Sequence, residues 1–384
     1  MTTRAAPSPA TIYWTAFVGL FFDYYDLYLF VYLERALAAE FALSATQSSW
    51  LQFAGLAGVG VGSLAFGFLA DKFGRGRAML ATFAVYGGGI AGISLAWSAG
   101  SLLAFRLVAS LALGAEWGIS HAYLAERVSG TARYRFSAWL QFSILGGLLA
   151  AMAARFALPV LGWRVLFAAS IVPVALLATW RWRALADGAS AEIPAASTAS
   201  LREAWKVHGR AFVACFAMAS LTIASGTMNV FFARELPQSP WFTAIFWLNV
   251  APGMLAGAWI VGRLGVTRAL LVYAAGLTAL SVACWAWAWP GRSLLFALVL
   301  PLLNGVPFGL MGAYFNEVFE RYRTTLSGAA YNLGRIAAGF APVLITALGL
   351  HEGGRYFLFT AAIGVAVAGL GAVLPRAMGD KRNC

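Results

Sequence analysis

Two aspartates, Asp23 and Asp26, stand in the middle of an otherwise hydrophobic segment, residues 11–34. A charged residue at the centre of a membrane helix costs about 2.5–3.5 kcal/mol, so segments that keep one use it for protons, ions or substrates. Residues three apart on a helix share one face. Two neighbouring carboxylates in a medium of low dielectric constant cannot both ionise cheaply, so one of them holds a proton near neutral pH. The spacing is typical of a proton carrier.

Three further ionisable residues fall inside hydrophobic spans: Arg106, Glu116 and Arg335. Counted from the outer helix ends, Asp26 and Arg106 lie at similar depth, and so do Glu116 and Arg335. Opposite charges at matched depth lower each other's cost, so we expect these two ion pairs. Arg106 is also a candidate substrate ligand, and the alternative for it is that it snorkels to the outer surface.

The pair Glu116–Arg335 has two interpretations. It is either an ion pair that only joins helices, or an exchange site. In the exchange site Arg335 binds a substrate carboxylate bidentately, while Glu116, Asp23 and Asp26 trade a proton. For the two aspartates the structural alternative is hydrogen bonding to nearby helices, with neighbouring tyrosines as donors.

Uncharged polar residues within the spans are candidate substrate ligands, although each amide alone is more often an interhelical hydrogen bond. The candidates are Tyr25, Tyr28, Gln141, Asn229, Asn304, Tyr331 and Asn332.

The composition excludes a soluble protein. Of the 384 residues, 61% are hydrophobic and 11% are charged, whereas soluble domains carry about 25% charged residues. The net charge of +12 does not indicate nucleic-acid binding, because the basic residues are spread over short loops. Three cysteines exclude a disulfide framework, and the three histidines have no metal-ligand spacing. We expect no metal, no cofactor and no enzyme activity.

Hydrophobic stretches of about 20 residues predict membrane helices. We expect an all-α membrane protein with twelve spans, at residues 11–34, 46–70, 78–98, 102–124, 134–158, 163–183, 210–233, 241–262, 268–289, 293–316, 325–349 and 354–375.

The distribution of Lys and Arg predicts the orientation. If both termini are inside, 19 of the 27 basic residues lie on the inner side, Arg181 among them, and six lie outside. Cytoplasmic loops carry this excess, so we expect cytoplasmic termini and a plasma membrane location, the inner membrane of a bacterium.

The two halves of the chain repeat each other at an offset of 191 residues. Gly74 and Arg77 align with Gly265 and Arg268, and a second region repeats in the same register. The second region aligns Gly114, Gly118, Tyr123 and Glu126 with Gly305, Gly309, Tyr314 and Glu317. We therefore expect two pseudo-symmetric six-helix bundles, residues 1–183 and 210–384, joined by a cytoplasmic linker at 184–209, with the substrate site between them.

The loop after the second span reads Gly67-Phe-Leu-Ala-Asp71-Lys72-Phe-Gly74-Arg75-Gly-Arg77. It resembles the signature loop of the major facilitator superfamily, G-x-L-a-D-r-x-G-r-r. The resemblance implies that Asp71 joins helix ends at the cytoplasmic face and stabilises the outward-open state, with Gly67, Gly74, Arg75 and Arg77 completing this gate. The alternative is a basic tight turn. The copy in the second half has Gly262 where Asp71 stands in the first.

Three shorter motifs are similar to those of the carboxylate–proton symporters in this superfamily, the sialate and lactate, aromatic-acid and metabolite groups. They are FFDYYDLYLF around the aspartates, LGAEWG around Glu116, and YNLGR ending at Arg335 and followed by Pro342. The chain departs from that pattern in its trimmed loops and in Ala115, which replaces a glycine. The resemblance places Arg335 on an anion-binding helix.

Together these features predict a proton-coupled secondary transporter that moves a small organic anion, a mono- or dicarboxylate, by alternating access. Its partners are a small-molecule substrate, protons and the bilayer, and we expect a monomer. One alternative is a proton antiporter that exports a metabolite or an amphiphilic drug. Another is a transport-inactive membrane sensor or scaffold.

Overall fold

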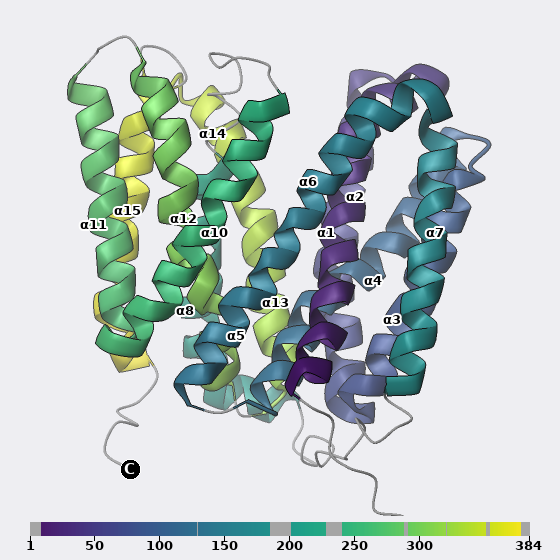
Figure 1. Cartoon of the computed structure of the whole chain (residues 1–384). Helices are drawn as coiled ribbons and strands as arrows, with labels where there is room; N and C mark the ends of the chain where they lie inside the picture. Colours follow the sequence, from purple (N-terminus) through teal and green to yellow (C-terminus); the bar gives the residue numbers. More distant parts are fainter. Residues whose placement is uncertain are drawn as a thin grey trace, which may run out of the picture. The chain divides into compact units, whose positions relative to one another are not determined.

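The computed structural model describes residues 9–128, 130–184, 201–227, 240–287, 291–319, 321–350 and 354–377 (Figure 1). These residues form helices and turns, and no strand occurs among them. The chain divides into two compact units. Unit 1 contains residues 1–128, 142–199 and 321–332, and unit 2 contains residues 129–141, 200–320 and 333–384.

Unit 1 is made mainly by the first part of the chain. Its helices are α1 (Pro9–Glu40), α2 (Ala45–Phe73), α3 (Arg75–Ser94), α4 (Ala99–Ala125), the 3-10 helix η1 (Phe142–Leu145), α6 (Gly146–Met152), the π-helix η2 (Ala153–Ala157), α7 (Leu158–Ala184) and the first part of α13 (Arg323–Gly339).

Unit 2 is made mainly by the second part. Its helices are α5 (Thr131–Gln141), α8 (Leu201–Thr227), α10 (Pro240–Leu264), α11 (Val266–Ala286), α12 (Arg292–Val318), the rest of α13, α14 (Ala341–Ala347) and α15 (Tyr356–Ala377). The beginnings of two predicted spans, residues 129–141 and 321–332, thus each belong to the unit formed mainly by the other part of the chain. The division into bundles 1–183 and 210–384 stays a prediction.

The described helices follow the predicted spans in order. The segments α5, η1, α6 and η2 continue into α7 as one helical run, which ends at a kink where Gly162 has a positive φ of 76°. A φ of this sign favours glycine, which has no Cβ to clash. The gap between α13 and α14 divides one predicted span. Residues 228–233 and 288–289 of two other spans, and with them Asn229, lie outside the described residues.

The internal repeat is confirmed in the packing of each unit. In unit 1, a Cβ added at Gly62 of α2 would collide with the Leu111 carbonyl of α4. In unit 2, a Cβ added at Gly253 of α10 would collide with the Leu302 carbonyl of α12. Each member of the second contact lies 191 residues after its counterpart in the first. Small residues let two backbones touch, which is how membrane helices pack closely.

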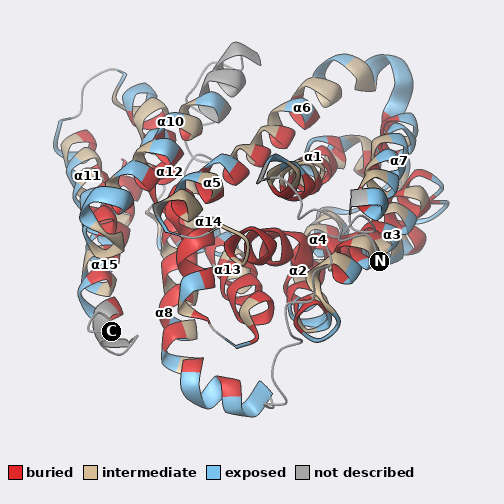
Figure 2. Cartoon of the chain, turned by 60° about the horizontal axis from the view of Figure 1, so that its bottom comes forward, coloured by how far each residue is buried: buried red, intermediate tan, exposed pale blue. Residues whose placement is uncertain are grey.

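The last residues of the predicted linker, 201–209, are helical. Helix α8 begins at Leu201, nine residues before the predicted span, and most of its first turns are exposed (Figure 2). Hydropathy places a helix start where the apolar run starts, so it misses a polar extension of the same helix. Residues 185–200 of the predicted linker lie outside the described residues.

The chain is a multi-pass membrane protein. Within the described residues, eight helices are long and apolar enough to cross a membrane, and one of them, Ala132–Arg183, has 52 residues, enough for two crossings. Large apolar side chains remain exposed on the helix surfaces, among them Val160, Trp97 and Trp50. In a membrane, lipid covers such side chains.

Candidate functional site

The first ion pair of the site joins α1 to α4. Nη1 of Arg106 lies 3.8 Å from Oδ2 of Asp26, and both side chains are buried. The guanidinium also lies over the ring of Phe30, 3.9 Å from its centroid. Neither carboxylate oxygen of Asp26 accepts a hydrogen bond from the described residues. The predicted pair Asp26–Arg106 is confirmed, whereas snorkelling is wrong, because Arg106 is 2% exposed.

The second ion pair differs from the expected one. Nη2 of Arg181, near the end of α7, lies 2.5 Å from Oε1 of Glu116 on α4, and Nη1 lies 3.4 Å from Oε2. The partner of Glu116 is therefore Arg181 and not Arg335. Arg335 is partly buried in the portion of α13 that belongs to unit 2. Matched depth does not specify which helix faces which, so the predicted pair Glu116–Arg335 is wrong.

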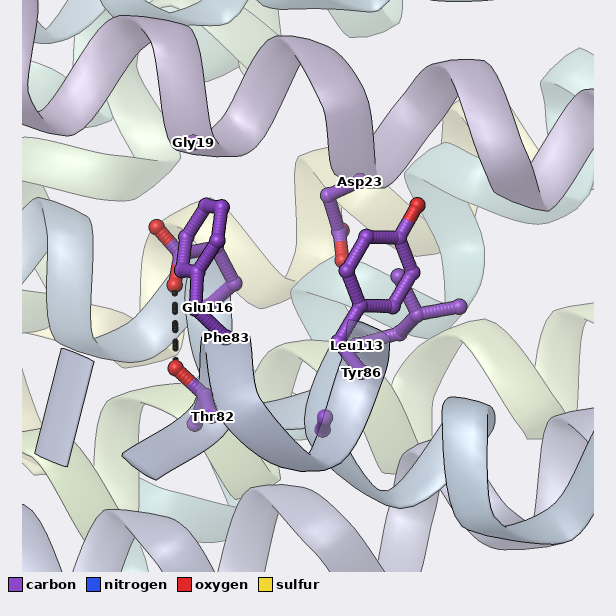
Figure 3. Close-up of a pocket in the computed structure, with 8 residues that line it drawn as sticks. Gly19, Asp23, Thr82, Phe83, Tyr86, Leu113 and Glu116 are labelled. Atoms are coloured by element: carbon purple, nitrogen blue, oxygen red, sulfur yellow. Dashed lines mark hydrogen bonds between the residues drawn. The ribbon is translucent and has the colours of Figure 1, made fainter. Parts of the chain in front are cut away.

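Asp23 and Glu116 line one small pocket in unit 1, with room for about one water molecule. Figure 3 shows Asp23 beside Tyr86, and Glu116 beside Phe83 and Thr82. The Thr82 hydroxyl donates to Oε2 of Glu116 at 3.5 Å, and the Ser120 hydroxyl donates to Oε1 at 2.9 Å. The predicted acids therefore form two groups, with Asp26 at Arg106 and Asp23 facing the pocket of Glu116.

The two tyrosines that follow Asp23 in the candidate set lie in the apolar part of unit 1. Tyr25 belongs to the buried hydrophobic core, and Tyr28 is partly buried and packs against it. Their proposed contact with substrate stays a prediction.

Tyr331 and Asn332 of α13 both contact α4. The ring of Tyr331 stacks on Trp117 with centroids 3.9 Å apart and planes 4° apart, and its hydroxyl lies 3.4 Å from that of Tyr24. Nδ2 of Asn332 donates to the Gly114 carbonyl at 2.7 Å. Sequence reasoning missed Trp117, because an apolar residue in an apolar span carries no signal of its own.

The two candidate amides of unit 2 make interhelical hydrogen bonds. Nε2 of Gln141 donates to the Phe308 carbonyl at 3.1 Å. Oδ1 of Asn304 accepts from the Ser225 hydroxyl at 2.8 Å and from the Tyr273 hydroxyl at 3.1 Å. This is the structural role that single amides in spans usually have.

The carboxylate of Asp71, at the end of α2, caps the first turn of α13. Oδ1 accepts from the backbone N–H of Thr324 at 3.1 Å, and Oδ2 accepts from the backbone N–H and hydroxyl of Thr325 at 2.8 and 2.7 Å. Gly67 permits this approach, since an added Cβ there would lie 2.9 Å from Cα of Thr325. The predicted gate loop therefore does join helix ends, and it is more than a tight turn.

Arg75 links the cap to α4. Its Nη2 lies 2.9 Å from Oδ1 of Asp71 and 2.7 Å from Oε1 of Glu126. Burial raises the pKa of Glu126, while the nearby cations, Arg75 first, oppose that shift. Gly74 makes the turn between α2 and α3 with a φ of 95°, and Arg77 is exposed. We call the packed surface formed by residues 323–332 of α13 against α2 and α4 the α13 seam.

The repeat supplies a counterpart of this network in unit 2. Glu317 of α12, at the position equivalent to Glu126, accepts from Nη1 of Arg133 at 3.3 Å and from the Tyr134 hydroxyl at 2.5 Å. Gly262 stands at the position of Asp71. The capping carboxylate is therefore a feature of unit 1.

Comparison with known proteins gives a consistent result. A family model described as Major Facilitator Superfamily matches residues 16–342. A cis,cis-muconate transport protein of Acinetobacter baylyi is 27% identical, over 86% of this chain and 85% of the relative. A niacin transporter of the same organism is 25% identical, over 95% and 93%. Among solved structures, a proton:xylose symporter aligns with a TM-score of 0.71 at 17% identity, covering 94% of each chain.

Proposed function

The chain belongs to the major facilitator superfamily, and we propose that within it this protein is a proton-coupled secondary transporter of a small organic anion. It works by alternating access, in the inner membrane of a bacterium and with both termini in the cytoplasm. The family and the relatives are transporters rather than enzymes. The coupling ion, the direction and the substrate class belong to the proposal.

The observation that carries the proposal is the set of three buried acids on two packed helices. Asp23 and Asp26 lie on α1 and Glu116 lies on α4, and all three are almost fully buried. Two of these acids face a guanidinium. A buried carboxyl group beside a cation has two favourable states: neutral with a bound proton, or ionised and paired with the cation. It can switch between them because the cation stabilises only the ionised form. A transporter needs such groups to link proton movement to substrate movement.

Two of the relatives favour a flat, conjugated acid as substrate. Muconate is a conjugated dienedioate and niacin is a pyridine carboxylic acid, so both join a carboxylate to a planar π-system. The stacked pair Trp117 and Tyr331 supports this choice, because each residue offers an aromatic face to a planar ligand when α13 moves away from α4. The hydroxyl of Tyr24 lies 3.4 Å from that of Tyr331 and offers a polar group at the stack.

Arg335 is the candidate for binding the substrate carboxylate. The planar guanidinium forms two parallel hydrogen bonds with a carboxylate, which an ammonium cannot reproduce. Because Glu116 pairs with Arg181, the interpretation in which Arg335 serves only to neutralise Glu116 loses its support. The other substrate contacts proposed from the sequence include Arg106, Gln141 and Asn304, which contact Asp26, the Phe308 carbonyl and the Tyr273 hydroxyl.

In the proposed cycle, protons reach the acids of unit 1 from outside and the anion binds at Arg335. The α13 seam then separates, and both ligands leave on the cytoplasmic side. The return of the carrier requires the acids to have released their protons. This order couples each anion to at least one proton and lets the proton gradient drive accumulation.

Uptake into proteoliposomes tests the proposal. The purified chain is reconstituted with the external solution one pH unit more acidic than the interior, and labelled cis,cis-muconate, adipate, nicotinate and piperidine-3-carboxylate are supplied outside. We expect accumulation of the flat acids over the saturated ones, and its loss in Asp26→Asn. Absence of uptake for every carboxylate contradicts the proposal. Efflux of preloaded acid driven by the same gradient, without uptake, identifies a proton antiporter instead.

A further inference from the structure

Arg181 is held inside unit 1 by four helices. Besides its bonds to Glu116 of α4, its Nε and Nη2 donate to the Thr15 carbonyl of α1 at 3.0 and 2.7 Å. Its guanidinium lies over the ring of Phe83 of α3, 4.4 Å from the centroid. The residue itself belongs to α7 and is fully buried. One side chain therefore connects α1, α3, α4 and α7.

The surroundings of Arg181 form a built site. A Cβ at Gly19 of α1 would collide with the Arg181 guanidinium, so the glycine leaves the space that the cation fills. The next residue, Trp182, is 65% exposed and Arg183 is exposed as well. Of the two arginines at this helix end, one therefore turns inward to a carboxylate and the other does not. A buried guanidinium is costly unless it is paired and hydrogen-bonded.

The repeat shows that the fold itself does not require this arrangement. The positions in unit 2 that correspond to Asp23, Glu116 and Arg181 are Ala214, Pro307 and Ala372. Unit 2 keeps the glycine-mediated contact between α10 and α12 without any of the three charges. Helix packing of this kind therefore does not depend on the charged residues Asp23, Glu116 and Arg181, which occur only in unit 1 of the two repeats.

Asp23 is the acid that the same pocket places beside Glu116. The pocket has room for about one water molecule, and such a molecule is enough to relay a proton between two carboxyl groups. The other polar groups that line it are Thr82 and Tyr86. Among the described residues, the charged and titratable side chains that face Glu116 are thus Arg181, Asp23 and Tyr86.

We infer that Arg181 is the positioning residue of a proton relay, which runs from Asp23 through one water to Glu116. The inference rests on the proposed proton coupling and assigns the inner step of that pathway. The water accepts a proton from the carboxyl group of Asp23 and passes one to the carboxylate of Glu116. The O–H bond of Asp23 and one O–H bond of the water break, a new O–H bond forms on the water and another on Glu116, and the net change is the transfer of one proton. Neutral Glu116 no longer attracts the guanidinium, so the link between the four helices weakens until Glu116 releases its proton.

The test compares gradient-driven accumulation with substrate counterflow in proteoliposomes, with labelled cis,cis-muconate and nicotinate as probes. The variants are Glu116→Gln, Arg181→Gln, the double variant and Arg181→Lys, and the matched control is Arg183→Gln at the exposed neighbouring position. A gradient of one pH unit coupled to one proton supports about tenfold accumulation. We expect the first three variants to lose it while counterflow, which needs no net proton movement, continues. Arg181→Lys should accumulate partly, and Arg183→Gln fully.

The double variant makes the result decisive, because it removes both charges of the Glu116–Arg181 pair together. Accumulation at the normal level in the double variant, or in Arg181→Gln, overturns the relay and leaves a structural ion pair. Loss of counterflow in a double variant that keeps its thermal unfolding temperature also overturns it. If the unaltered protein accumulates no carboxylate, the proposed function fails. If it accumulates and the double variant does so equally, only this inference fails.

Discussion

Replacement of Asp71 by alanine should open the α13 seam. Three hydrogen bonds link its carboxylate to Thr324 and Thr325, and Arg75 lies 2.9 Å away. The change removes the acceptor of all three bonds and exposes the first turn of α13. Arg75 keeps its contact with Glu126 at 2.7 Å, so its charge does not become unpaired.

The size of the effect follows from these contacts. A hydrogen bond to a charged group contributes about 1.5–3 kcal/mol, but water replaces part of this when the seam separates. We take about 3 kcal/mol for the whole cap, which corresponds to about a 150-fold rise in the open population. Asp71→Asn keeps one acceptor oxygen and should give a smaller rise.

Alkylation of a single cysteine measures the open population. The reporter is Ala330→Cys, at a position of the seam that is fully buried, in a background where the three native cysteines are alanine. When opening and closing are faster than labelling, the labelling rate follows the open fraction. We expect a rate rise of about two orders of magnitude in Asp71→Ala and none in Arg77→Ala, which changes an exposed residue of the same loop. An unchanged rate in Asp71→Ala would refute this account of the seam.

Three further predictions concern packing, pH and charge. Gly62→Ala should lower stability by about 1–3 kcal/mol, because the added methyl collides with backbone, whereas Gly88→Ala, with nothing within 4 Å, should not; thermal unfolding compares them. In the closed seam the pKa of Glu126 is raised above its ordinary value of 4.5. Protonated Glu126 therefore stabilises the closed seam at pH values below 4.5, and this stabilisation is lost as the pH rises through the raised pKa. The labelling rate of Ala330→Cys, divided by the rate in unfolded protein at the same pH, should therefore increase between pH 4.5 and the raised pKa. If the rate increases with pH equally in a Glu126→Gln variant, Glu126 is not the cause. Asp26→Asn leaves the buried guanidinium of Arg106 without its carboxylate and should lower the free energy of unfolding by about 3–5 kcal/mol. Adding Arg106→Gln should restore most of the lost unfolding free energy. No recovery in the double variant would show that the broken ion pair does not cause the loss.

Sequence alone predicted the features that depend on order and depth along the chain. The loop around Asp71 is a local motif, so its residues, apart from the exposed Arg77, appear where the motif places them. Depth along a helix is linear in residue number, which is why Asp26 and Arg106 were paired correctly. The repeat was visible because glycines that mediate backbone contact tolerate no substitute.

Rotation around the helix axis and side-chain reach were not predictable in this way. Glu116 and Arg335 share a depth, but depth does not specify which neighbour each helix faces. Arg181 was counted with the loops because it lies near a helix end, yet a long side chain can extend from there back into the core. Trp117 stayed unrecognised because hydropathy does not distinguish an aromatic face that serves a ligand from one that fills space.

The backbone contact between α2 and α4 has a mechanical consequence. Where glycine lets two helices touch through main-chain atoms, no side chain at the contact can change rotamer to absorb a displacement. The two helices therefore move together as a rigid body. Asp71 belongs to α2, and Arg106, Glu116 and Trp117 belong to α4. A displacement of the first turn of α13, which Asp71 caps, therefore moves Glu116 and the ring of Trp117 together, without a series of side-chain rearrangements between them.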